Sequence, residues 1–240
     1  MENNYWIVDD LLIFKPEFND ELDEYYDIIN KYKKIMFSNY NKPLIAIETN
    51  NLYENIYTFN YIRSIFNKKI DLSNNIILTH LFLGSLFNQE INLSNNINLK
   101  YLFFGYKFNQ EINLSNNINL THLTFGLYFN KKIDIPLNIK SLNMDYCNNQ
   151  FIIDNLHNNI VELKINGTNL NLDNLTNSIK KIYIFYYYKK LNNLSNSIEY
   201  LELNNYEFKI KKIPKNLKMI KCDKNYKYIN DFKDYKIILF

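Results

Sequence analysis

The feature that most constrains the fold of this chain is a 21-residue segment that is repeated almost unchanged. The segment FNQEINLSNNINLKYLFFGYK begins at Phe87, and FNQEINLSNNINLTHLTFGLY begins at Phe108. Related segments begin with FNKKI at Phe66 and at Phe129, so four Phe-Asn pairs are spaced 21 residues apart. A fixed period of this length indicates a repeat protein, in which each repeat is one structural unit stacked on the next.

Each repeat also carries two apolar residues separated by one other residue, first seen at Leu81 and Leu83. Because alternate residues of a strand point to the same face, each pair predicts a short strand with two inward side chains. A weaker turn is expected before them, around Asn60 and Ile62. The eight clear pairs, at steps of 19 or 21 residues, are Leu81/Leu83, Leu102/Phe104, Leu123/Phe125, Leu142/Met144, Leu163/Ile165, Ile182/Ile184, Leu201/Leu203 and Ile220/Cys222.

A further apolar column and turn residues complete each repeat. Asn and Ser in the segments SNN, IPLN and LSNS bond nearby backbone groups and favour turns. A single repeat cannot bury its apolar residues alone, so the sequence predicts a β-rich solenoid with one short parallel strand per 19–22-residue turn. The residues expected to form the opposite wall of its core are Leu72, Leu93, Leu114, Ile135, Leu156, Leu175, Leu194 and Ile213.

The segment NNINLTHLTFGLYFNKKIDIP resembles the FNIP repeat, also called IP22, which is abundant in social amoebae and in giant viruses that infect amoebae. The resemblance is good over residues 66–136 and traceable to about Cys222. Ser occupies most positions where the family has Pro, which is kept at Pro136 and Pro214. The resemblance implies a leucine-rich-repeat-like stack, and it implies no catalytic activity because the family's repeat residues are structural.

Residues 1–50 are expected to form a small α+β cap, with 51–222 as the solenoid and 223–240 as a C-terminal cap. Apolar residues at helical intervals predict a helix over about residues 20–37, capped by Asn19 or Asp20, and LIAIE at 44–48 is expected to be a strand. Some members of the resembled family carry an F-box in this region. A degenerate F-box of about three helices is the alternative, and it would make the chain a substrate-recognition subunit of a ubiquitin ligase.

Charge and cysteine usage favour a monomer in the cytoplasm, or in the host cytoplasm if the chain is viral. The first residues lack the basic start of a signal peptide, and no apolar run approaches the roughly 20 residues of a membrane span. Cys147 and Cys222 lack metal-ligand spacing; Cys222 is expected to be buried and Cys147 more accessible. Nine acids lie between Glu2 and Asp27, whereas ten lysines lie between Tyr206 and Lys236, so the two ends carry opposite charge.

No constellation predicts an enzyme, a metal site or a cofactor. His80 and His122 share one repeat position but lie two turns apart, about 10 Å at the spacing of adjacent strands, which is too far for one metal ion. The position after the Phe-Asn-x-x-Ile motif alternates between Asp71 or Asp134 and an Asn. Such a residue serves a turn and not proton transfer. A second alternative, nucleic-acid binding by the basic C-terminus, is disfavoured because acids interrupt the lysines.

The residues that alternate with the inward pairs form an outward column, which is the usual binding face of leucine-rich repeats. We therefore expect a non-enzymatic protein–protein interaction module with an unknown protein partner. An aromatic strip in this column either faces water and binds the partner or is covered by the N-terminal segment, and both interpretations stay open. The biased composition, rich in Asn, Ile and Lys, fits an AT-rich genome, so an individual Asn gives weak evidence of a role. The candidate partner-binding residues are His80, Phe82, Tyr101, Phe103, His122, Thr124, Lys164 and Tyr183.

Overall fold

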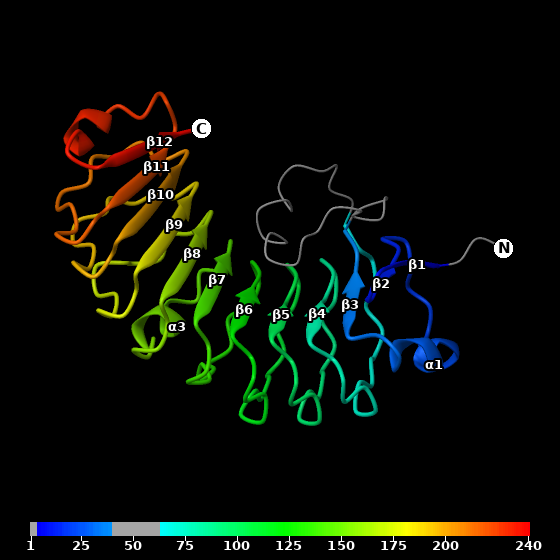
Figure 1. Ribbon diagram of the computed structural model, residues 1–240. Helices are drawn as coiled ribbons and strands as arrows, with labels where there is room; N and C mark the ends of the chain where they lie inside the picture. Colours follow the sequence, from blue (N-terminus) through cyan, green and yellow to red (C-terminus); the bar gives the residue numbers. More distant parts are fainter. Residues whose placement is uncertain (1–3, 40–62) are drawn as a thin grey trace. The chain divides into compact units, whose positions relative to one another are not determined.

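The computed structural model describes residues 4–39 and 63–240. The chain forms two compact units, Met1–Leu120 and Thr121–Phe240. Each unit is a stack of solenoid turns in which short strands follow one another in chain order (Figure 1). The chain is therefore a leucine-rich-repeat-like β-solenoid with little helix, as the sequence predicts.

In the first unit β1 and β2 form an antiparallel hairpin, and β2 to β5 pair in parallel. A 3-10 helix η1 (Asp23–Tyr25) and a short helix α1 (Tyr26–Ile29) connect β2 to β3. The strands are β1 (Tyr5–Val8), β2 (Leu11–Phe14), β3 (Lys34–Phe37), β4 (His80–Phe82) and β5 (Tyr101–Phe103).

In the second unit all the strands pair in parallel with their sequence neighbours. Helix α3 (Gln150–Asp154) lies between β7 and β8 in sequence, and the 3-10 helix η2 (Ile229–Phe232) precedes the last strand. The strands are β6 (His122–Phe125), β7 (Ser141–Asp145), β8 (Glu162–Asn166), β9 (Lys181–Phe185), β10 (Tyr200–Asn204), β11 (Met219–Cys222) and β12 (Lys236–Leu239).

The eight predicted apolar pairs lie on β4 to β11, except that Leu83 and Phe104 directly follow β4 and β5, and all sixteen side chains are buried. The parallel registers place equivalent apolar residues of successive turns side by side, for example Leu81 beside Leu102 and Leu142 beside Leu163. The opposite wall is buried too, except for Ile213, which is partly exposed. These two walls enclose the core of each unit.

A column of phenylalanine rings fills the core of the first unit. The rings of Phe37 and Phe66 stack with centroids 3.9 Å apart, and the column continues to Phe87 (6.0 Å) and from there to Phe108 (6.2 Å). Each of these rings is buried, so the Phe of the Phe-Asn motif points inward.

In the second unit three buried tyrosines follow Phe129, and each of their hydroxyls has a main-chain partner. The Tyr187 hydroxyl donates to the Leu170 carbonyl oxygen (2.7 Å), the Tyr226 hydroxyl donates to a carbonyl one turn earlier, and the Tyr206 hydroxyl accepts from the Leu191 N–H (2.9 Å). Cys147 is also buried in this unit, close to the Phe129 carbonyl oxygen (3.3 Å). The expectation of an accessible Cys147 was therefore wrong, whereas Cys222 is buried as predicted.

Asparagine side chains connect consecutive turns. The main-chain N–H of Asn88 donates to Asn67 Oδ1, and that of Asn109 to Asn88 Oδ1, both at 2.8 Å. The turn residue Asp71 accepts from the N–H of Ser73 at 2.9 Å, which is the local bond expected of an Asx turn. The side chain of the Asn in the Phe-Asn motif thus bonds the main chain of the next solenoid turn.

The N-terminal region differs from the expected helix over residues 20–37. Helical structure ends at Ile29, and Lys34–Phe37 is strand β3, paired with β2 on one side and β4 on the other. Ile35, Met36 and Phe37 are all buried, so this segment gains more from a place in the sheet than from helix. The expected strand at 44–48 and the weak turn at Asn60 and Ile62 lie outside the described residues. Strands β1, β2 and β12 were not predicted.

Candidate interaction surface

The ladder face of each unit consists of the strand residues that alternate with the inward pairs. It carries all eight candidate residues that the sequence predicts. Four of them, on β4 and β5, belong to the first unit, and four, on β6, β8 and β9, belong to the second. Their surroundings differ between the two units.

The ladder face of the first unit is apolar. Leu11, Ile13, Met36 and Phe82 form a buried cluster against which Phe103 packs, together with Trp6 and Val8 of β1. The register brings Ile13, Met36, Phe82 and Phe103 side by side on successive strands. The N-terminal strands therefore continue the predicted aromatic strip sideways, and Phe82 keeps only 4% exposure.

His80 and Tyr101 form a stacked pair in the same face. Their rings lie 4.3 Å apart with planes 9° from parallel, and Thr79 Oγ1 lies 2.8 Å from His80 Nδ1. His80 is buried, whereas Tyr101 and Phe103 are partly exposed. Only the latter two of the four predicted residues in this unit have side-chain surface that a partner could reach without rearrangement.

The ladder face of the second unit begins with a half-buried histidine. Burial lowers the pKa of His122, and the nearby Glu162 carboxylate opposes that effect while Lys164 adds to it. Thr121 Oγ1 lies 2.9 Å from His122 Nδ1. The neighbouring Thr124 is fully buried, so this predicted residue has no surface to offer.

From β7 onward the ladder face is polar and aromatic. Glu162 Oε1 accepts from the Ser141 hydroxyl (2.9 Å) and lies 3.8 Å from the Lys164 ammonium. That ammonium lies 4.8 Å from the centre of the Tyr183 ring, a distance at which cation–π attraction acts. Ion pairing and ring contact thus hold Lys164 and Tyr183 in place.

The network extends over β10 and β11 through residues outside the candidate set. Tyr183 lies 5.3 Å from the ring of Tyr200, whose hydroxyl donates to Glu202 (2.6 Å). Glu202 also pairs with the Lys221 ammonium at 3.3 Å. The sequence places Tyr200, Glu202 and Lys221 in the same outward column, so their position was predictable although their contacts were not.

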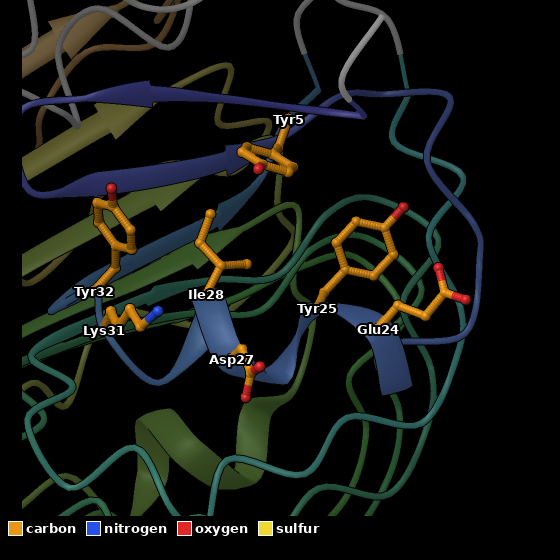
Figure 2. Close-up of a pocket in the computed structure, with 7 residues that line it drawn as sticks. All are labelled: Tyr5, Glu24, Tyr25, Asp27, Ile28, Lys31 and Tyr32. Atoms are coloured by element: carbon orange, nitrogen blue, oxygen red, sulfur yellow. The ribbon is translucent and has the colours of Figure 1, made fainter. Parts of the chain in front are cut away.

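No group of three His, Cys, Asp or Glu side chains within residues 4–39 and 63–240 could hold a metal ion. A shallow groove of about 430 Å³ lies beside α1, lined by Tyr5, Glu24, Tyr25, Asp27, Ile28, Lys31 and Tyr32 (Figure 2). It contains no nucleophile paired with a base.

The chain is similar to the crystal structure of CroV588, a giant-virus protein described as having "a novel circular LRR protein structure". The two share 27% sequence identity, with a TM-score of 0.53 over 93% of this chain. The matched region spans 38% of CroV588's length. No family model matches the chain, and no curated protein matches it. A leucine-rich-repeat-like fold, with a giant-virus protein as a structural neighbour, is thereby shown.

None of the helices in the described part of the chain has the length and apolar character needed to cross a membrane.

Proposed function

We propose that this chain is a non-enzymatic repeat protein that binds another protein through the ladder face of its second unit. The observation that carries the proposal is the row formed by Lys164, Tyr183, Tyr200, Glu202 and Lys221 on four consecutive parallel strands. Aromatic residues with a polar tip are enriched at protein interfaces. The row therefore combines interface residues with the broad face that solenoids present.

Preorganisation supports this role. The Tyr200–Glu202 and Glu202–Lys221 contacts, together with the Lys164–Tyr183 contact, fix the side chains before a partner arrives. Ordering them in advance reduces the entropy lost on binding. The residues Lys164 and Tyr183 of the sequence prediction belong to this row, and the role of the other candidates stays a prediction.

The FNIP resemblance and a cytoplasmic location belong to the same proposal. Two free, buried thiols fit a reducing compartment, the host cytoplasm if the chain is viral. We do not propose an F-box, since residues 4–39 contain three strands, one three-residue 3-10 helix and one four-residue α-helix. Nucleic-acid binding is also not proposed, because Lys209, Lys218 and Lys221 of the basic region pair with acids.

Affinity capture from the native cell tests the proposal. Proteins retained by the wild type should be lost with Tyr183→Ala and with Lys221→Glu, which change the row. They should be kept with Tyr188→Ala, a tyrosine that is 63% exposed beyond the end of β9. Retention of the same proteins by all three variants would place the binding surface elsewhere.

A further inference from the structure

The C-terminal edge of the sheet is open among the described residues. The Lys236 N–H donates to the carbonyl oxygen of Lys218, just before β11, and the Phe240 N–H donates to that of Cys222, at the end of β11. Both distances are 3.2 Å. Successive main-chain groups of a strand point to opposite sides. The main-chain groups of Ile237 and Leu239 therefore point away from β11, where no described strand pairs with β12.

Apolar side chains are exposed at this end of the described chain. Leu239 lies beside the buried Cys222 in register and so continues the inward column, yet it is 50% exposed. Phe240 follows on the opposite face, where its ring is 46% exposed and lies 4.4 Å from the Lys221 ammonium. A strand residue that faces the core side and remains exposed marks an apolar surface without a neighbour in this part of the chain.

The N-terminal edge has matching features. The Lys15 N–H donates to the Asn4 carbonyl oxygen (3.0 Å), so by alternation the main-chain groups of Tyr5 and Ile7 point away from β2. Ile7 is 46% exposed. Tyr5 also lines the groove beside α1, where Figure 2 shows Ile28 directed towards it. This end thus has an open strand edge next to a partly apolar groove.

The two ends carry opposite charge. Residues 4–39 contain eight acids and four lysines, whereas residues 206–240 contain ten lysines and four acids. Glu24 and Asp27 line the N-terminal groove, and Lys233 and Lys236 are exposed at the C-terminal end. Opposite charges favour encounter between these ends over encounter between two like ends.

We propose that the C-terminal end of one copy of this chain docks on the N-terminal end of another, head to tail. The edge of β12 pairs with the edge of β1, and Leu239 packs against Ile7 and the groove beside α1. Because the two contacting surfaces differ, each added copy leaves one end open, which yields chains or closed rings. The monomer expected from the sequence is then the dilute state. The edges are only four residues long, so the association is weak and weakens further with salt.

The test measures mass against concentration for the 240-residue protein by light scattering and sedimentation. The average mass of the wild type should rise above 29.0 kDa with concentration and fall back in high salt. Ile7→Asp blocks the N-terminal end and Leu239→Asp the C-terminal end, so each variant alone should stay monomeric. An equal mixture should form a dimer and no larger species, because each variant keeps the end that the other lacks.

A matched control distinguishes contacts between the ends from non-specific association through exposed apolar residues. Ile118→Asp changes a residue that is 65% exposed in a turn, and it should associate like the wild type. The double change Glu24→Lys with Asp27→Lys should weaken association without touching the core, which keeps the test valid if Ile7→Asp misfolds. A wild type that stays monomeric up to about millimolar concentration, a mixture that forms no dimer, or an Ile118→Asp variant that loses association would each overturn the proposal.

Discussion

The buried side chain of Asn96 donates a hydrogen bond of 2.9 Å to the main-chain oxygen of Asn75, the equivalent residue one turn earlier. The same amide donates to the Leu72 carbonyl oxygen, also at 2.9 Å. Asn75 repeats the arrangement towards Ile29 and Tyr32. One amide per turn therefore gives a second donor to two main-chain oxygens of the preceding turn, because the Leu72 oxygen already accepts from the Asn75 N–H and the Asn75 oxygen from the Leu78 N–H.

Replacing Asn96 by Ala should destabilise the protein by roughly 1–3 kcal/mol, because two buried hydrogen bonds between turns are lost while both carbonyl oxygens keep a main-chain donor. Urea denaturation measures the loss. Asn98→Ala is the matched control: its amide also donates to a carbonyl oxygen of the preceding turn, at 2.9 Å, but the residue is exposed, so its loss should cost under about 1 kcal/mol. Equal losses for the two variants would show that burial of the acceptors is not what makes Asn96 important.

This asparagine role could not be predicted from the sequence. Asn is so common in the chain that composition alone explains any single one. Whether an amide reaches the next turn depends on the lateral alignment of turns, which no local pattern specifies. The turn bonds of Asp71, by contrast, are local, and they were predictable.

The strands show the same division between local and non-local information. Strands β4 to β11 were predicted because one face of each lies in the core and the other does not, so their apolar residues recur with a period of two. Leu11–Phe14 is buried on both faces, since Leu12 and Phe14 lie in the core while Leu11 and Ile13 join the ladder-face cluster. That double burial removes the alternation, so β2 was missed. Likewise, the outward direction of Phe82 was predictable, but its burial depends on Met36 of the neighbouring strand.

The phenylalanine column predicts a clear contrast between inward and outward rings. Phe108→Ala should cost roughly 3–5 kcal/mol, because a fully buried ring leaves a cavity between Phe87 and Phe104. Phe103→Ala removes a ring of the same size from a partly exposed position on the ladder face, so it should cost much less. Urea melts compare the two directly. A larger loss of stability for Phe103→Ala than for Phe108→Ala would mean that the inward and outward faces of β5 are assigned the wrong way round.

The two thiols should react slowly in the native protein. Burial raises the pKa of Cys147 to about 11 and that of Cys222 to about 11, so only about one thiol in a thousand is ionised at pH 8. We expect labelling by a disulfide reagent at pH 8 to be roughly a hundredfold slower than for an unfolded chain, and to become fast in urea. Cys147→Ser and Cys222→Ser, tested singly, assign the signal. Rapid labelling of either thiol in the native state would contradict its burial.

Alkaline pH should destabilise the second unit through its buried tyrosines. Burial raises the pKa of Tyr206 from 10.0 to about 12, and the pKa values of Tyr187 and Tyr226 are raised for the same reason. Below pH 10 these phenols are neutral in both states, so their contribution is unchanged there. Above pH 10 the unfolded chain releases protons that the folded protein still holds, so the free energy of unfolding must fall as the pH rises towards 12.

Tyr206→Phe removes one such group and should make that fall less steep, although at neutral pH it should lower stability because the Leu191 N–H loses its acceptor. The exposed Tyr188→Phe serves as control and should change neither quantity. Urea melts at several pH values from 8 to 11.5 give both quantities, and an unchanged slope in Tyr206→Phe would mean that this phenol ionises alike in the folded and unfolded chain.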